Sequence, residues 1–176
     1  MIDIHEETFR ICTWDVDRAD RLTMAAAYNF CQEVAGNHAA ALGVGGDFMK
    51  RNGIVWILSR MSAVLESRPG SGSSILVRTW PLGTERLFAI REYELADGNG
   101  VVFGRGRSAW LIVDAETYRP RRPEAIVAGL PLNEGSEALP GGAAGLDPVP
   151  GLDVAGTRAV VSSDLGYKGH TNNARY

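Results

Sequence analysis

The segment from Thr23 to Gly43 reads TMAAAYNFCQEVAGNHAAALG and predicts one long helix. Thr23 is typical of an N-cap, because its hydroxyl can accept a hydrogen bond from a free amide of the first turn. Small or apolar residues recur at steps of three and four, which places them on one helix face: Ala27, Cys31, Val34, His38, Ala41 and Leu42. Gly43 ends the helix, since glycine adopts the left-handed C′ conformation at little cost. No second helix is predicted.

The segments around this helix are predicted to be extended. A short strand at residues 9–14 precedes it, and strands at 53–66, 75–80, 86–96 and 101–113 follow in antiparallel succession. Asp97-Gly-Asn-Gly predicts a hairpin, because both dipeptides tolerate positive φ. One helix of about 19 residues is close to 30 Å long, about the width of a small domain. The economical arrangement is α+β: an antiparallel sheet wrapped around one central helix, the hotdog fold.

The 176 residues are predicted to divide into three parts. Residues 1–128 form the hotdog domain. Residues 129–156 contain seven glycines and four prolines, and this composition is typical of a flexible linker. Residues 157–176, with an expected strand at 158–162, are predicted to start a second, truncated hotdog domain.

Composition excludes several classes of function. Eighteen Lys and Arg against 21 Asp and Glu give a net charge of −3, which argues against a nucleic-acid partner that relies on bulk positive charge. The longest apolar run, about Ile54–Leu58, is far below the ~18–20 residues that span a bilayer, so no membrane association is expected. The N-terminus has no basic and apolar signal-peptide pattern, and a cytoplasmic location is expected. Cys12 and Cys31 lack metal-ligand spacing, and no motif implies a metal or cofactor.

Residues 163–176 read SDLGYKGHTNNARY. This stretch resembles the active-site loop that opens the second hotdog of acyl-ACP thioesterases. Segments of the first unit are similar to the same family: Ala27–His38, Lys50–Met61, Arg78–Trp80 and Gly106–Val113. The resemblance covers about residues 6–125 and 157–176. It implies hydrolysis of fatty acyl thioesters in fatty acid biosynthesis, with acyl carrier protein as the partner and hotdog pairing as a homodimer or pseudo-dimer.

The residue types in this loop suit thioester hydrolysis. His170 can orient or deprotonate an attacking water, and we expect it to be catalytic. Thr171-Asn172-Asn173 is predicted to open a helix whose free amides polarise the thioester carbonyl, with Asn172 and Asn173 binding substrate. The resemblance places Gly166 and Lys168 where the family has an Asp and an Asn, so a non-hydrolytic acyl-binding or scaffold protein is the alternative. Asp164 is expected to cap or brace the turn.

Four residues of the first unit are candidates for binding the acyl chain. Trp56, Met61 and Trp80 either line a tunnel between helix and sheet or fill the core. The resemblance favours the tunnel, because the first hotdog of these enzymes is expected to set chain-length selectivity. His38 lies on the apolar helix face, where a histidine is either a ligand or a hydrogen-bonded core residue. A hotdog dehydratase is a weaker third hypothesis, because its histidine and acid would have to face each other across a dimer and His38 is the histidine that the first unit offers for this role.

Overall fold

The computed structural model describes residues 4–147, 149–166 and 171–175, apart from the side chain of Asn173. Its elements follow in this order: β1 (His5–Arg10), α1 (Met24–Ala41), α2 (Gly46–Asn52), β2 (Ile54–Leu65), β3 (Ser74–Glu85), β4 (Phe88–Asp97), β5 (Val102–Asp114), β6 (Pro120–Arg121), α3 (Glu124–Val127), and the 3-10 turns η1 (Ser162–Asp164) and η2 (Asn173–Arg175).

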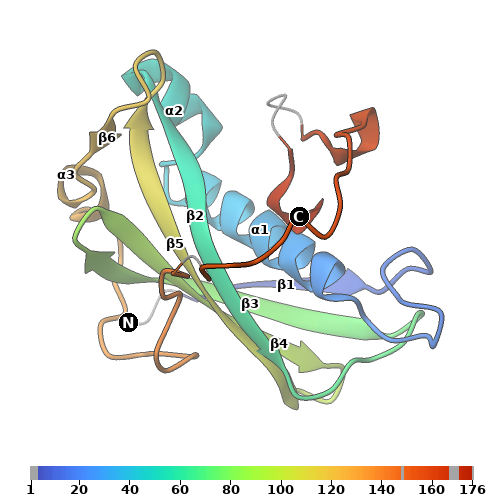
Figure 1. Cartoon of the computed structure of the whole chain (residues 1–176). Helices are drawn as coiled ribbons and strands as arrows, with labels where there is room; N and C mark the ends of the chain where they lie inside the picture. Colours follow the sequence, from blue (N-terminus) through green and yellow to red (C-terminus); the bar gives the residue numbers. More distant parts are fainter. Residues whose placement is uncertain (1–3, 148, 167–170, 176) are drawn as a thin grey trace.

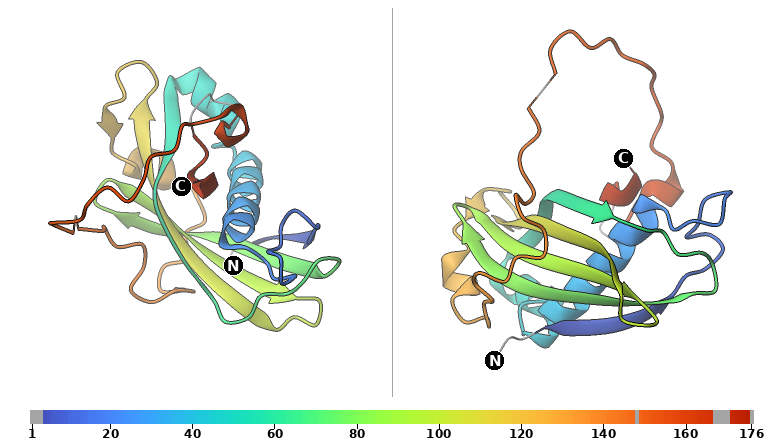
Figure 2. Two further views of the ribbon diagram at one scale, coloured as in Figure 1. Left: turned by 45° about the vertical axis from the view of Figure 1, so that its right-hand side comes forward. Right: turned by 90° about the horizontal axis from the view of Figure 1, so that it is seen from below.

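The strands form one antiparallel sheet in the order β1-β3-β4-β5-β2, with β6 added beside β5. The sheet curves around α1, which crosses its inner face (Figures 1 and 2). The predicted hotdog fold is confirmed. Although β2 directly precedes β3 in the chain, it pairs with β5 and forms the far edge of the sheet. None of the described helices is long and apolar enough to span a bilayer.

Helix α1 begins and ends where local chemistry predicts. The Thr23 hydroxyl accepts a hydrogen bond from the Ala26 amide at 3.2 Å, and Leu42 is the C-cap. Gly43 follows with φ 76°, the left-handed conformation in which glycine is least strained. The buried face consists of Ala26, Ala27, Cys31, Val34, Ala35 and His38, whereas Ala41 is exposed in the last turn.

The core lies between this small-residue face and the inner face of the sheet. Ile75, Val77, Tyr93, Leu95 and Phe103 supply its sheet side, and all are buried. Alanine and cysteine on the helix leave room for these larger side chains to approach closely. Residues 75 and 77 therefore define which face of β3 points toward α1, and side chains of the other parity point to the outer face.

Several local predictions differ from the structure: α3 was not predicted, β3 ends at Glu85 instead of residue 80, and three further differences have local causes. The first strand lies at His5–Arg10 instead of 9–14, because Asp15 accepts a hydrogen bond from the Cys12 amide and a turn begins there. Helix α2 was not predicted, since its seven residues bury no side chain and carry no apolar period. Residues 157–161 have no regular structure and pair with none of the described strands, although a strand at 158–162 was predicted.

The division into 1–128, 129–156 and 157–176 stays a prediction, but part of the predicted linker has a defined position. Residues 133–142, which we call the strap, run across the outer face of the sheet (Figure 1). The Asn133 amide donates to Pro81 O at 3.0 Å, and Asn133 and Ala138 are buried. Beyond the strap, residues 144–147 and 149–163 are exposed.

Candidate active-site pocket

A pocket of about 940 Å³ lies between α1, α2 and the sheet. This volume is within the range of small-molecule sites, roughly 300–1,000 Å³. Apolar groups from several elements line it: Val44, Met49, Trp56, Leu58, Ile90 and Trp110. Polar residues of α1, including Asn29 and Gln32, and Arg91 of β4 also reach its wall. The pocket can therefore hold an extended apolar ligand that carries a polar group.

The C-terminal segment contributes Gly166, Thr171 and Asn172 to the same pocket wall. Asp164, which is buried, holds this segment in shape: its carboxylate accepts from the Val161 amide at 3.0 Å and from Arg158 at 2.8 and 2.9 Å. The Val161 amide, followed by Arg158, lowers the pKa of Asp164 below its ordinary value. The Asn172 amide donates to Asp164 O at 2.8 Å. This arrangement fits the predicted bracing role of Asp164.

The predicted catalytic residue His170 lies outside the described residues, as do Lys168 and the side chain of Asn173. The turn η2 begins at Asn173, where a helix start was predicted. Asn172 lines the pocket, and its Oδ1 accepts from the Ala174 amide at 2.9 Å. Asn172 thus caps the turn, and its predicted contact with substrate stays a prediction.

The three candidate tunnel residues have different surroundings. Trp56 lines the pocket and is fixed by a 3.1 Å hydrogen bond from its Nε1 to Val44 O. Met61 packs against the core beneath α1. Trp80 lies on the outer face, because its parity along β3 is opposite to that of Val77, and its Nε1 donates to Ser136 O of the strap at 2.9 Å. The structure therefore brings Trp56, but not Trp80, to the pocket.

His38 is 2% exposed and contacts Arg91, a residue that the sequence analysis did not single out. Arg91 Nη1 lies 3.0 Å from His38 Nδ1, and since a guanidinium can only donate, Nδ1 must accept and the imidazole is neutral. Arg91 also donates to Thr79 Oγ1 at 3.1 Å, and the His5 ring stacks on His38 at 5.1 Å. This geometry fits the interpretation of His38 as a hydrogen-bonded core histidine.

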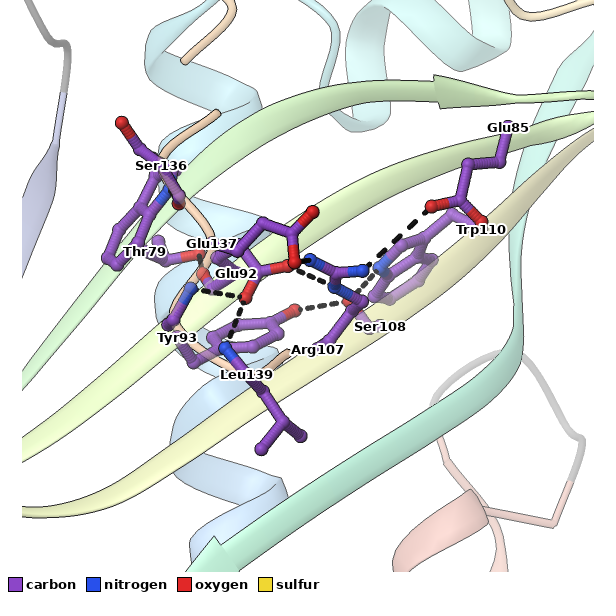
Figure 3. Close-up of polar contacts among 12 residues, drawn as sticks. Thr79, Glu85, Glu92, Tyr93, Arg107, Ser108, Trp110, Ser136, Glu137 and Leu139 are labelled. Carbon is purple, nitrogen blue, oxygen red and sulfur yellow. Dashed lines mark hydrogen bonds and ion pairs between the residues drawn. The ribbon is translucent and has the colours of Figure 1, made fainter. Parts of the chain in front are cut away.

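A second polar chain fixes Trp110 in the pocket wall. Trp110 Nε1 donates to Ser108 Oγ at 2.7 Å, and the Tyr93 hydroxyl lies 2.9 Å from the same oxygen (Figure 3). Burial raises the pKa of Tyr93 to about 12, so its hydroxyl stays protonated at neutral pH. Across residues 4–147, 149–166 and 171–175, no three His, Cys, Asp or Glu side chains are grouped so that they could hold a metal ion.

The fold and the pocket define a hotdog protein with a site between helix and sheet, and comparison with known proteins gives the family. Residues 3–129 match the family model of the acyl-ACP thioesterase N-terminal domain. The chain belongs to the acyl-ACP thioesterase family.

Curated relatives are similar over the same region. The chain is 27% identical over 122 residues to oleoyl-acyl carrier protein thioesterase 1, chloroplastic, of Arabidopsis thaliana. This match covers 65% of this chain and 34% of that protein. It is 22% identical over 123 residues to palmitoyl-acyl carrier protein thioesterase, chloroplastic, of Cuphea hookeriana, covering 66% of this chain and 30% of that protein. The matches thus span about a third of these relatives' length.

Solved structures agree with the fold. An acyl-ACP thioesterase from Bacteroides thetaiotaomicron superimposes with a TM-score of 0.87 at 27% identity, over 98% of this chain and 70% of that chain. The 12:0-ACP thioesterase from Umbellularia californica superimposes with a TM-score of 0.82 at 20% identity, over 98% of this chain and 72% of that chain, and this likeness supports the fold alone.

Proposed function

We propose that the protein hydrolyses fatty acyl thioesters carried by acyl carrier protein, as a step of fatty acid biosynthesis. The observation that carries the proposal is the pocket, whose wall combines Trp56 and Leu58 of β2 with Gly166 and Thr171 of the C-terminal segment. An acyl chain suits the apolar part, and the segment that precedes Thr171 carries His170. Two relatives, from Arabidopsis and Cuphea, are described as oleoyl- and palmitoyl-acyl carrier protein thioesterases.

In the proposed reaction, water attacks the thioester carbonyl while His170 accepts a proton from it. The carbon–oxygen bond forms first, the carbon–sulfur bond then breaks, and the proton passes to the departing sulfur. The products are a fatty acid and the carrier thiol. Backbone amides after His170 would stabilise the negative charge that develops on the carbonyl oxygen.

The alternative is a protein that binds acyl chains without hydrolysing them. Gly166 lines the pocket without offering a side chain, and the Asn172 Oδ1 is already used to cap the turn at Ala174. The described residues of the C-terminal segment therefore contribute few side chains to the pocket wall that could act as an acid, a base or a nucleophile.

One assay separates the two functions. Release of free thiol from acyl-ACP is measured for the wild type, for His170→Gln and for Glu94→Gln, a control on the outer face of β4, opposite the pocket. Hydrolysis predicts thiol release that falls at least about 100-fold in His170→Gln only, since general acid–base catalysis contributes this much. Stable retention of the acyl chain without thiol release would instead favour the binding protein.

Two further expectations belong to this proposal. Pairing of hotdog sheets, as a homodimer or within one chain, is proposed because β2 has a neighbour on only one side among the described strands. Sedimentation equilibrium gives the molar mass in solution and so distinguishes a homodimer from a monomer. A cytoplasmic location stays a prediction.

A further inference from the structure

Arg91 is the one arginine whose guanidinium is buried in the wall of the described pocket. It comes from the inner face of β4 and is 9% exposed. Its hydrogen bonds run from Nη1 to His38 Nδ1 and to Thr79 Oγ1, which are both uncharged acceptors. A guanidinium has five N–H donors, so most of its donor capacity is left for a ligand in the pocket.

A second buried arginine, Arg107 on the outer face of β5, shows how this chain pairs a buried arginine elsewhere. Arg107 is 5% exposed, contacts the fully buried carboxylate of Glu92, and lies 3.2 Å from Glu137 and 3.9 Å from Glu85 (Figure 3). Around Arg91, by contrast, no carboxylate of the described chain comes within 4.0 Å. Burial lowers the pKa of Arg91, which is the direction expected for a cation that lacks a counter-ion.

An isolated buried cation destabilises a fold unless an anion accompanies it. Among the described residues no carboxylate supplies that anion at Arg91, and the pocket is the space from which a ligand could supply it. A guanidinium matches a carboxylate through two parallel N–H···O hydrogen bonds, and apolar groups such as Ile90 and Trp110 line the same pocket. The matching ligand therefore combines a carboxylate with an alkyl chain.

We propose that Arg91 forms a carboxylate-binding subsite in the pocket and retains alkyl-chain carboxylates, the class to which the acid product of thioester hydrolysis belongs. The identity of this ligand as a product rests on the proposed function, whereas binding of the carboxylate does not. The subsite would make the protein sensitive to inhibition by its own product.

The test compares two ligands that differ only in charge. Decanoate and methyl decanoate are titrated into the whole chain, and their dissociation constants are measured by calorimetry or by displacement of a fluorescent fatty acid. We expect decanoate to bind about 10-fold or more tightly than the ester, the effect of a charge-assisted hydrogen bond. Equal affinities would overturn the proposal.

Two variants assign any preference to this arginine. Arg91→Met keeps much of the side-chain volume, should remove the preference for decanoate and should leave ester binding within about threefold. Arg105→Met is the matched control, because Arg105 lies on the outer face and pairs with Glu66 at 2.7 Å. Decanoate preference that survives in Arg91→Met, or that is lost equally in Arg105→Met, would refute the assignment.

A measurement on the wild type covers the case in which Arg91→Met does not fold. Decanoate carrying 13C at its carboxyl carbon is titrated with acid while bound, and its chemical shift reports the protonation state. Pairing with a guanidinium should lower the pKa of the bound carboxyl group relative to free decanoate. An unchanged or raised pKa would contradict the subsite. Because no turnover is measured, inactivity toward acyl-ACP would leave this result interpretable.

Discussion

Replacing Glu92 by glutamine should destabilise the whole domain, although Glu92 lies on the face of the sheet opposite the pocket. Its carboxylate is 0% exposed and contacts Arg107, and it also accepts from the amides of Ala138 and Leu139 at 2.9 and 3.1 Å. Removing one partner of a buried ion pair costs about 3–5 kcal/mol, and we expect the lower end, about 3 kcal/mol, because Arg107 keeps its contact with Glu137 at 3.2 Å. For a domain of this size the corresponding fall in Tm is roughly 6–12 °C.

The assay is urea unfolding followed by circular dichroism, with Glu94→Gln as the matched control. Glu94 lies on the same face of β4, but it is partly exposed and 3.7 Å from Arg78, so its replacement should cost at most about 1 kcal/mol. A Glu92→Gln value indistinguishable from that of Glu94→Gln would refute the reasoning. The double variant Glu92→Gln with Arg107→Met should recover part of the loss, since glutamine can still accept from the amides of Ala138 and Leu139 and methionine leaves no uncompensated charge.

Three further predictions concern stability and thiol reactivity. A chain ending at Ala128 lacks the strap and should lose at least as much free energy of unfolding as Glu92→Gln. The same urea titration measures this loss, and a shortened chain as stable as the full chain would show that the strap is dispensable. Thr23→Ala should lower the free energy of unfolding by about 1 kcal/mol through loss of the N-cap, and no change would mean that the 3.2 Å hydrogen bond contributes nothing net. Burial raises the pKa of Cys31 to about 12. At pH 8 a thiol reagent should therefore modify Cys12 in the native protein and both thiols after unfolding. Rapid modification of two thiols in the folded state would contradict the buried position of Cys31.

The elements that sequence reasoning found depend on nearby residues. Both ends of α1 are specified within a few positions by Thr23 and Gly43. The hairpin at Asp97 is similar: its Oδ1 accepts from the amides of Asn99 and Val101 at 2.9 Å, so the turn is defined within five consecutive residues. The orientation of Trp80 could also have been predicted from the sequence, because the alternation of Ile75 and Val77 places residue 80 on the outer face of the sheet.

The features that sequence reasoning missed join distant residues. Arg91 and His38 are 53 positions apart, and no periodicity links them. The strap is poor in large apolar groups, so its composition resembles that of a linker. Its position instead depends on backbone amides that bond to Glu92, and backbone donors are the same in every sequence. Tertiary hydrogen bonds of this kind leave no pattern in hydrophobicity.

The exposed segment after the strap has a consequence for how the pocket is completed. It leaves the outer face, bows away from the sheet and returns on the α1 side with Thr171 and Asn172 (Figure 2). Both of its ends are thereby attached to one domain, and a tether that behaves as the predicted flexible linker would hold its far end at an effective concentration on the order of 1 mM. Contacts with α1 need contribute only about 4 kcal/mol to keep such a segment seated half of the time. The chain can therefore vary the length and sequence of the tether widely while the segment that closes the pocket stays in place.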